Sequence, residues 1–129
     1  MARRGNGRRR SLLLGCALLL LPAACADPAR DRYEKAEKSL QYRRMEEALA
    51  GYRSIAREFP QSRYAPAALL RQGDLYGSYY RNFPAALEAY DSLVFNYPRS
   101  SEAPRALLRS SEVHLFQYLD PAAASADLE

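Results

Sequence analysis

Few side chains in this 129-residue sequence have the types and spacing that catalysis requires. There is a single histidine, His114, and the sequence holds no metal-ligand cluster, glycine-rich phosphate loop or nucleophile–base motif. The sequence repeats itself, and the repeat aligns His114 with Tyr76. We therefore expect His114 to be a structural residue on a packing face. Acidic residues such as Glu46 stand near Arg43, as on a solvated helix surface. The sequence therefore predicts a protein that is not an enzyme, binds no metal or cofactor and acts on no small-molecule substrate.

The N-terminal residues have the composition of an export signal. Five arginines without any acid precede an apolar run at 11–21, which contains Cys16 and is followed by small residues. A basic stretch, an apolar run of about 7–15 residues and small residues before a cut define a signal peptide. A membrane-spanning helix is the alternative, but it needs about 20 apolar residues. We therefore assign residues 1–24 to a signal peptide.

Cys25 would be the one cysteine left after cleavage, so no intrachain disulfide can form. The preceding sequence, LPAAC, resembles a bacterial lipobox, in which small residues precede a cysteine that becomes lipidated and N-terminal. Pro22 departs from the aliphatic residue that is usual at its position. We expect Cys25 to carry a lipid that anchors the protein to a membrane. Ordinary cleavage at Ala24, without an anchor, is the alternative.

The export route and destination follow from the neighbouring residues. Arg9-Arg10-Ser11 loosely resembles a twin-arginine signal, but nothing in the sequence requires folded export, so the general secretory route is expected. The residue after Cys25 is Ala26 and not the aspartate that is typical of retention in the inner membrane. We therefore expect a lipid-anchored protein at the periplasmic face of the outer membrane.

Removal of the signal changes the charge of the protein. The whole chain carries +4, but five of its 19 basic residues and none of its 15 acidic residues precede Cys25, so the mature part carries −1. A near-neutral charge does not favour nucleic acid. Stacking of bases on the ten tyrosines is the alternative. Because Tyr52 and Tyr90 fall at repeat core positions, packing is the better explanation.

The sequence repeats itself at a fixed interval, the one that separates Tyr52 from Tyr90. YRSIAREFP at 52–60 matches YDSLVFNYP at 90–98, and PQSRYAPAALLR at 60–71 matches PRSSEAPRALLR at 98–109. Internal repeats with a period of roughly 20–50 residues are typical of solenoid proteins. The repeat therefore decides the fold class before any single element is assigned.

Each repeat predicts two helices. Apolar residues recur at helical spacing in 48–55 and again in 86–93. Pro66 and Pro104 suit the first turn of a helix, where the missing N–H has no partner to lose. A Phe-Pro or Tyr-Pro step ends the helix before each of these, because the residue before proline is disfavoured in helical geometry. The sequence predicts an all-α chain.

The repeat resembles the tetratricopeptide signature, with one extra residue between the helices and three between repeats. The resemblance implies a helical-hairpin solenoid over 31–129 after a linker at 25–30. Small residues let the paired helices approach closely, and tyrosines fill the gaps beside them. Two full repeats would span about 31–60 and 66–98, with an incomplete third at 104–129. The signature positions are occupied by Leu69, Gly73, Tyr76, Phe83, Ala86, Tyr90 and Pro98.

The run RYEKAEKSL at 32–40, shortly after Cys25 and followed by FPQSRYAP and YPRSSEAP, is similar to repeat lipoproteins of the BamD type. That family belongs to the machinery that assembles outer-membrane β-barrel proteins. The resemblance implies a periplasmic interaction scaffold that binds the assembly barrel and its companion lipoproteins. Coordinators of the Tol-Pal and cell-division type have similar repeats, and pilus or secretin pilot lipoproteins share the anchor and the repeats. These families remain alternatives.

In stacked helix pairs the first helices line a concave side on which a partner segment can lie. We expect exposed leucines at equivalent positions on this side to form part of a partner-binding groove. Ordinary solvent-exposed helix residues are the alternative. The expected groove residues are Leu70, Asp74 and Ser78 in one repeat, and Arg105, Leu108 and Glu112 in the next.

The third repeat is incomplete, so its first helix would lack the helix that covers it in the other repeats. Either the sequence is part of a longer protein, which we favour, or a binding partner covers this face. The apolar residues concerned are Leu107, Leu108, Val113, Leu115 and Phe116.

Overall fold

The computed structural model describes residues 27–119, which form five α-helices and one π-helix and hold no strand. The signal peptide, Cys25 and residues 120–129 lie outside the described residues. The prediction of an all-α chain is confirmed for the described part. Its elements are α1 (Pro28–Gln41), α2 (Met45–Glu58), α3 (Ala65–Asp74), η1 (Leu75–Tyr79), α4 (Phe83–Asn96) and α5 (Ala103–Leu119).

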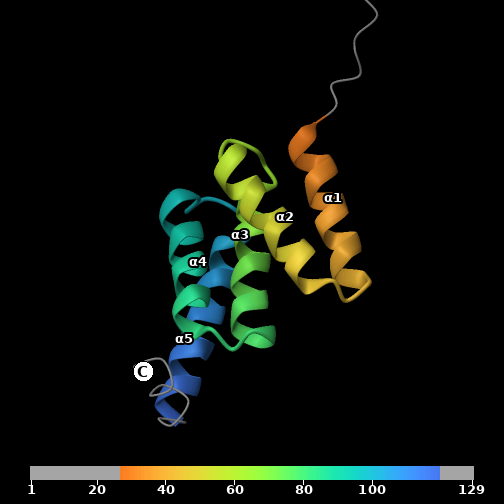
Figure 1. Cartoon of the computed structure of the whole chain (residues 1–129). Helices are drawn as coiled ribbons and strands as arrows, with labels where there is room; N and C mark the ends of the chain where they lie inside the picture. Colours follow the sequence, from red (N-terminus) through yellow and green to blue (C-terminus); the bar gives the residue numbers. More distant parts are fainter. Residues whose placement is uncertain (1–26, 120–129) are drawn as a thin grey trace, which may run out of the picture.

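The helices are arranged as successive hairpins (Figure 1). Each α-helix packs on the next one in the chain, so that α1 contacts α2, α2 contacts α3, α3 contacts α4 and α4 contacts α5. The first helix of one pair, α3, also contacts the first helix of the next pair, α5. The molecule is therefore a row of helix pairs in which α3 is enclosed by neighbours on three sides.

The first helix begins earlier than the sequence led us to expect. Asp27 caps α1 by accepting hydrogen bonds from the amides of Ala29 (3.1 Å) and Arg30 (3.3 Å), and Pro28 occupies the first helical position. An aspartate cap followed by proline satisfies the free amides of a helix start. The helix thus includes residues 28–30, which we had assigned to the linker.

The predicted packing faces of α2 and α4 are confirmed. Tyr52 and Ile55 of α2 are fully buried, and Tyr90 and Leu93 occupy the equivalent places in α4. The predicted helix ends are also confirmed, since α2 ends at Glu58 and α4 at Asn96, before the Phe-Pro and Tyr-Pro steps. Two apolar clusters result, one built around α2 and one around α4 and α5.

Close helix approach at Gly73 agrees with its predicted role as a small packing residue. A Cβ atom placed on Gly73 would lie 2.2 Å from Cε1 of Tyr90, and Ala86 is fully buried. No carbon atom can approach another so closely without displacement. The absence of a side chain at Gly73 therefore makes room for the Tyr90 ring between α3 and α4.

The first helix of each of the first two pairs ends in a left-handed residue that is not glycine. Arg43 has φ 61° and Arg81 has φ 56°. After α1 the amide of Arg44 donates to the carbonyl of Ser39 (2.9 Å), and that of Arg43 donates to the carbonyl of Leu40 (3.0 Å). This is the Schellman arrangement, which usually carries glycine at the left-handed position.

The π-helix η1 accounts for an extra residue in the second pair. The amide of Tyr42 donates to the carbonyl of Lys38, four residues back, whereas that of Tyr80 donates to the carbonyl of Leu75, five residues back. Tyr42 and Tyr80 are equivalent, because one repeat interval separates them. A single π-type turn widens the helix by one residue without breaking it. The first helix of the second pair therefore also ends in a left-handed residue, Arg81, but there the amide of Asn82 donates to the carbonyl of Tyr76, six residues back (2.8 Å).

Candidate partner-binding surfaces

A three-residue polar network joins α1, α2 and α3. The hydroxyl of Tyr52 in α2 donates a hydrogen bond to the Glu37 carboxylate in α1 (2.7 Å). Arg71 in α3 donates to both oxygens of the same carboxylate, through Nε (2.9 Å) and Nη2 (3.2 Å). Charge-assisted hydrogen bonds of this kind are stronger than neutral ones. Glu37 thus connects its own hairpin to the first helix of the next.

The same network recurs one pair further along the chain. The hydroxyl of Tyr90 in α4 donates to Oδ1 of Asp74 in α3 (2.9 Å), and Nε of Arg109 in α5 lies 3.5 Å from that oxygen. The tyrosines of the two networks are one repeat interval apart, and so are the arginines. Glu37 and Asp74 are one residue closer together in the sequence than the two tyrosines are, because the residue that η1 adds comes after Asp74. The two repeats therefore share these side-chain interactions as well as residue types.

Burial raises the pKa of Tyr52 and of Tyr90 above its ordinary value, and the neighbouring carboxylates, Glu37 and Asp74, add to this effect. A phenol with a raised pKa stays neutral and keeps its proton for donation at physiological pH. The hydroxyls of both tyrosines are therefore protonated at neutral pH, where they donate their hydrogen bonds to Glu37 and Asp74.

Two of the expected groove residues are brought together by a third that the sequence analysis missed. Arg109 lies 3.5 Å from Asp74 and donates to Glu112 at 2.8 Å through Nη1. Arg109 and Glu112 are less than one turn apart in α5, whereas Asp74 belongs to α3. The signal for Arg109 was present in the sequence, because it matches Arg71 in the internal repeat. Asp74 is therefore engaged in packing between pairs.

By exposure, the expected groove residues divide into exposed and buried ones. Ser78 in η1 is exposed, and so are Arg105, Leu108 and Glu112 in α5. The positions of these three in α5, three and four residues apart, place them on one face of the helix. They form a continuous surface strip, as predicted for α5.

The prediction that Leu70 is an exposed groove residue is wrong. Leu70 is only 5% exposed and belongs to the cluster that joins α3, α4 and α5. Leu108, at the equivalent position, is 58% exposed. The difference arises because α5 covers α3, whereas no helix of the described residues covers this face of α5. Equivalent positions in a repeat have the same exposure only when they have the same neighbours.

The expectation for His114 is wrong as well. We expected it on a packing face because it aligns with Tyr76, which is half-buried against the core. His114 is exposed. The two environments differ. The helix α4 follows Tyr76 in the chain and packs against η1, whereas no helix follows α5 within residues 27–119.

The apolar residues of α5 divide between packed and exposed positions. Val113 is buried and Phe116 is half-buried against Phe83, with their ring centroids 5.2 Å apart. Leu107, Leu108 and Leu115 are more than half exposed, so the expectation of an uncovered apolar face is confirmed for these three and wrong for Val113 and Phe116. Leu119, which was not among the expected residues, is also exposed.

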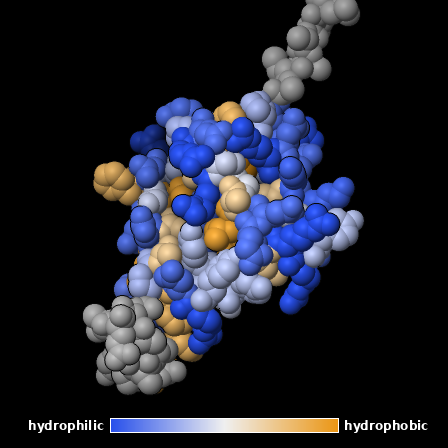
Figure 2. Space-filling model, viewed as in Figure 1, coloured by the Kyte–Doolittle hydropathy of each residue, from blue (hydrophilic) through white to orange (hydrophobic). Residues whose placement is uncertain are grey.

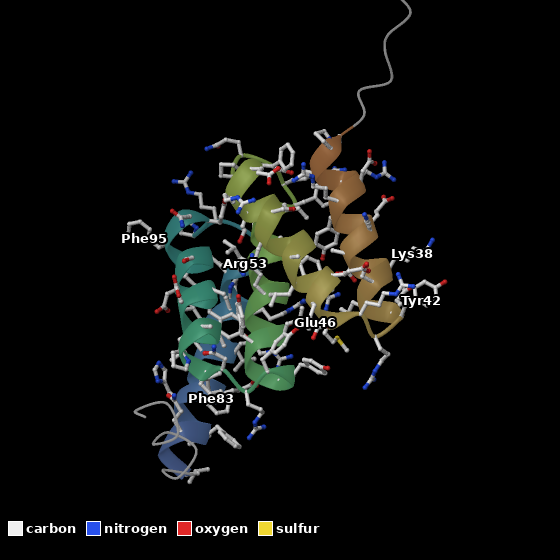
Figure 3. The ribbon with its side chains drawn as sticks, in the orientation of Figure 1. Lys38, Tyr42, Glu46, Arg53, Phe83 and Phe95 are labelled. Carbon is white, nitrogen blue, oxygen red and sulfur yellow. The ribbon has the colours of Figure 1, made fainter. Side chains whose placement is uncertain are left out.

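A groove that the sequence analysis missed runs between α2 and α4, with α3 as its floor. Its widest stretch has a volume of about 610 Å³ and lies between Arg53 and Arg57 on one side and Ser92 and Asn96 on the other. Figure 2 looks onto the face where it opens and shows apolar side chains at the centre among hydrophilic ones. Arg53 lies over the middle of this face in Figure 3.

The floor of the groove contains a polar side chain that the sequence could have signalled. Gln72 occupies the same helix face as Leu69, three residues before it, and Tyr76, four residues after it. Leu69 is buried and Tyr76 packs against the core. A glutamine in such an apolar stripe requires a partner, and Nε2 of Gln72 has none in the described structure.

The described residues offer neither a metal site nor a membrane span. Residues 27–119 contain no cluster of three or more histidine, cysteine, aspartate or glutamate side chains that would hold a metal ion. Within the same range no helix is long and apolar enough to cross a membrane.

No family model, curated protein or solved structure matches this chain.

Proposed function

We propose that this protein is a tetratricopeptide-like solenoid that binds other proteins along the first helices of its pairs. The observation that carries the proposal is the recurrence of the Tyr–carboxylate–Arg network, from Tyr52 and Glu37 to Tyr90 and Asp74. Stacked units that use the same interface between neighbours are the defining feature of a solenoid. Such proteins present extended surfaces to partner segments.

The residues near the surface strip of α5 support binding and not catalysis. Asp74 and Arg109 are held by structural partners, and the leucines of α5 are left exposed. Exposed apolar surface on a folded protein favours association with another protein. Turnover of any substrate that is lost on mutation of Asp74 or Glu112 would overturn this proposal.

The partner we propose is the machinery that assembles outer-membrane β-barrel proteins. The support comes from the sequence, which combines the lipobox-like LPAAC with repeats similar to those of BamD-type lipoproteins. A lipid on Cys25 would hold the repeats close to the inner surface of the outer membrane. Incorporation of labelled palmitate that persists in Cys25→Ser would contradict the anchor.

Co-purification tests the partner. The tagged full-length chain is isolated from detergent-solubilised envelopes, and the expected result is enrichment of the assembly barrel. Replacement of Leu107 and Leu108 by aspartate should reduce that enrichment at least fivefold, because both side chains are exposed on α5. The matched control is Phe95→Asp, which changes a side chain that is 85% exposed on α4 and points away from the body (Figure 3). Clean isolation without the barrel would contradict the proposal.

A further inference from the structure

We propose that the groove between α2 and α4 is a second binding site, which takes an acidic peptide segment in extended form. The site is separate from the surface strip of α5 and from the polar network beside it. Gln72 in its floor and Asp74 in the polar network are two residues apart on α3, which places them on nearly opposite sides of the helix. The inference therefore goes beyond the proposed function and does not depend on it.

The charge of the groove favours an acidic ligand. The widest stretch is lined by two arginines and by no carboxylate. Arg57 is paired with Glu58 (3.0 Å), whereas Arg53 makes no ion pair within the described residues. A carboxylate of the ligand would give Arg53 a charged partner at the edge of the groove, where two guanidinium donors can be shared. Glu88 lines the adjoining stretch together with Arg53 and Gln72, and Glu46 lines the stretch beyond it, so the acid-free part of the groove lies beside the C-terminal turns of α2 and α4.

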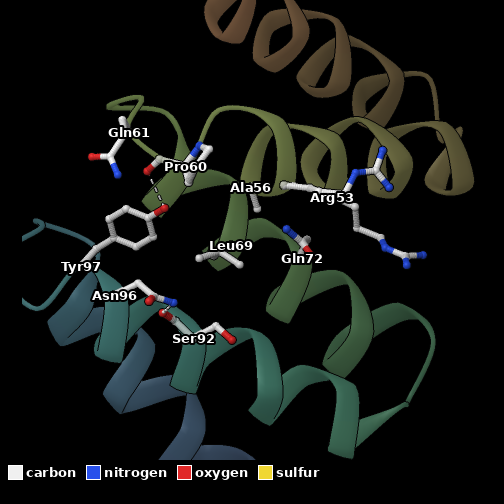
Figure 4. Close-up of a pocket in the computed structure, with 10 residues that line it drawn as sticks. Arg53, Ala56, Pro60, Gln61, Leu69, Gln72, Ser92, Asn96 and Tyr97 are labelled. Atoms are coloured by element: carbon white, nitrogen blue, oxygen red, sulfur yellow. Dashed lines mark hydrogen bonds between the residues drawn. The ribbon is translucent and has the colours of Figure 1, made fainter.

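The unpartnered amide of Gln72 is the second feature that points to a ligand. Gln72 is 7% exposed, and its Nε2 has no hydrogen-bond partner among the described residues. A buried donor that is left unsatisfied destabilises the fold. In Figure 4 Gln72 lies on the floor of the groove, between the side chains from α2 and α4. Because Nε2 itself is closed to solvent, an oxygen of a bound peptide would satisfy this donor after a rotation of the Gln72 side chain toward the groove.

The shape of the groove suits an extended segment. Ala56 and Leu69 give the widest stretch an apolar bottom. Its far end is fixed by the Tyr97 hydroxyl, which donates to the Pro60 carbonyl (2.7 Å) and so ties the end of α4 to the end of α2. The flanking helices of 14 residues are about 21 Å long. The whole groove accommodates roughly six residues of extended chain, and the acid-free stretch beside the second halves of α2 and α4 accommodates roughly half of them.

Isothermal titration calorimetry with a defined, unlabelled peptide tests the inference. The probe is an eight-residue peptide of alternating glutamate and leucine, acetylated and amidated so that its only charges are side-chain carboxylates. We expect saturable binding to the full chain. Arg53→Glu should weaken it at least tenfold, because Arg53 is the unpaired cation of the groove. Lys38→Glu makes the same charge change on α1, away from the groove (Figure 3), and should leave the affinity within twofold of the original.

A second variant separates a ligand site from a structural residue. Gln72→Leu removes the unsatisfied donor, so we expect a higher melting temperature together with weaker binding of the acidic peptide by at least threefold. Equal binding of a matched lysine–leucine peptide, equal binding by Arg53→Glu, or no saturable binding would overturn the inference. None of these results depends on co-purification with the assembly barrel, so the two proposals fail independently.

Discussion

Tyr52 and Tyr90 each serve two purposes at the scale of single residues. The rings fill core positions that are almost fully buried, and the hydroxyls donate to Glu37 and Asp74 on the neighbouring helices. The spacing of the tyrosines predicted the first role, because both fall on the apolar face of a helix. The second role could not be predicted, since it depends on which carboxylate the packing of two helices brings within reach.

Tyr90→Phe tests the hydroxyl alone. The change keeps the ring and removes the hydrogen bond to Asp74, which should lower the free energy of unfolding by about 1–2 kcal/mol. Urea unfolding followed by circular dichroism gives the value. Tyr79→Phe is the control, because Tyr79 is 51% exposed, and it should change the stability by less than about 0.5 kcal/mol. Equal losses in the two variants would show that the hydroxyl of Tyr90 has no special role.

The same tyrosines predict a loss of stability in alkali. Burial raises the pKa of Tyr52 and of Tyr90 above the ordinary value of 10.0. Below about pH 10 the phenol is protonated in both states, so the stabilisation is fully present; above it the unfolded state releases its proton first and stability falls. Urea unfolding between pH 8 and about pH 11 should show this fall, and replacing both tyrosines with phenylalanine should reduce its slope. An unchanged slope would contradict the assignment.

Gly73→Ala tests the close approach of α3 and α4. The added methyl group would lie 2.2 Å from the Tyr90 ring, so we expect a loss of about 1–3 kcal/mol in the free energy of unfolding. Gly77→Ala is the matched control, because its Cβ would meet Ala86 at an ordinary 3.5 Å, and it should be neutral or stabilising by up to about 1 kcal/mol. A stabilised Gly73→Ala protein would contradict the close approach of α3 and α4.

At the scale of the elements, the helix boundaries followed from local chemistry. Proline at the starts and the Phe-Pro and Tyr-Pro steps at the ends act within a few residues of the chain, so the sequence alone revealed them. The π-helix η1 did not show itself in this way. The resemblance to the tetratricopeptide signature required an extra residue between the helices but did not place it. The hydrogen bonds place it within Leu75–Tyr79, because the amide of Tyr80 donates to Leu75, five residues back, whereas the equivalent amide of Tyr42 donates to Lys38, four residues back.

The left-handed end of α1 gives a prediction at the same scale. Arg43 has φ 61°, a conformation that costs an ordinary residue about 1 kcal/mol and glycine almost nothing. Arg43→Gly should therefore raise the free energy of unfolding by roughly 0.5–1 kcal/mol. Glu88→Gly, within α4, should lower it by about 1 kcal/mol because glycine is a poor helix former. Destabilisation by both changes would contradict the Schellman cap.

For the whole molecule, exposure depends on what lies next to each pair. Leu70 and Leu108 are equivalent in sequence, yet one is buried beneath α5 and the other is exposed. A repeat alignment identifies the positions that face a neighbour but not whether the neighbour is present. For the same reason the groove between α2 and α4 was missed, because its arginines and Gln72 come from segments that only the stacking of the pairs brings together.

Site-specific photocrosslinking at Leu108 tests the central claim most directly. A photoreactive amino acid is placed at position 108 of the full chain, or at position 95 as the control, and the envelope is irradiated. Both native side chains are apolar and more than half exposed, on α5 and α4 respectively. We predict a cross-link from position 108 to the assembly barrel or a companion lipoprotein and none from position 95. No cross-link from 108, or equal cross-links from both positions, would contradict a partner-binding surface on α5.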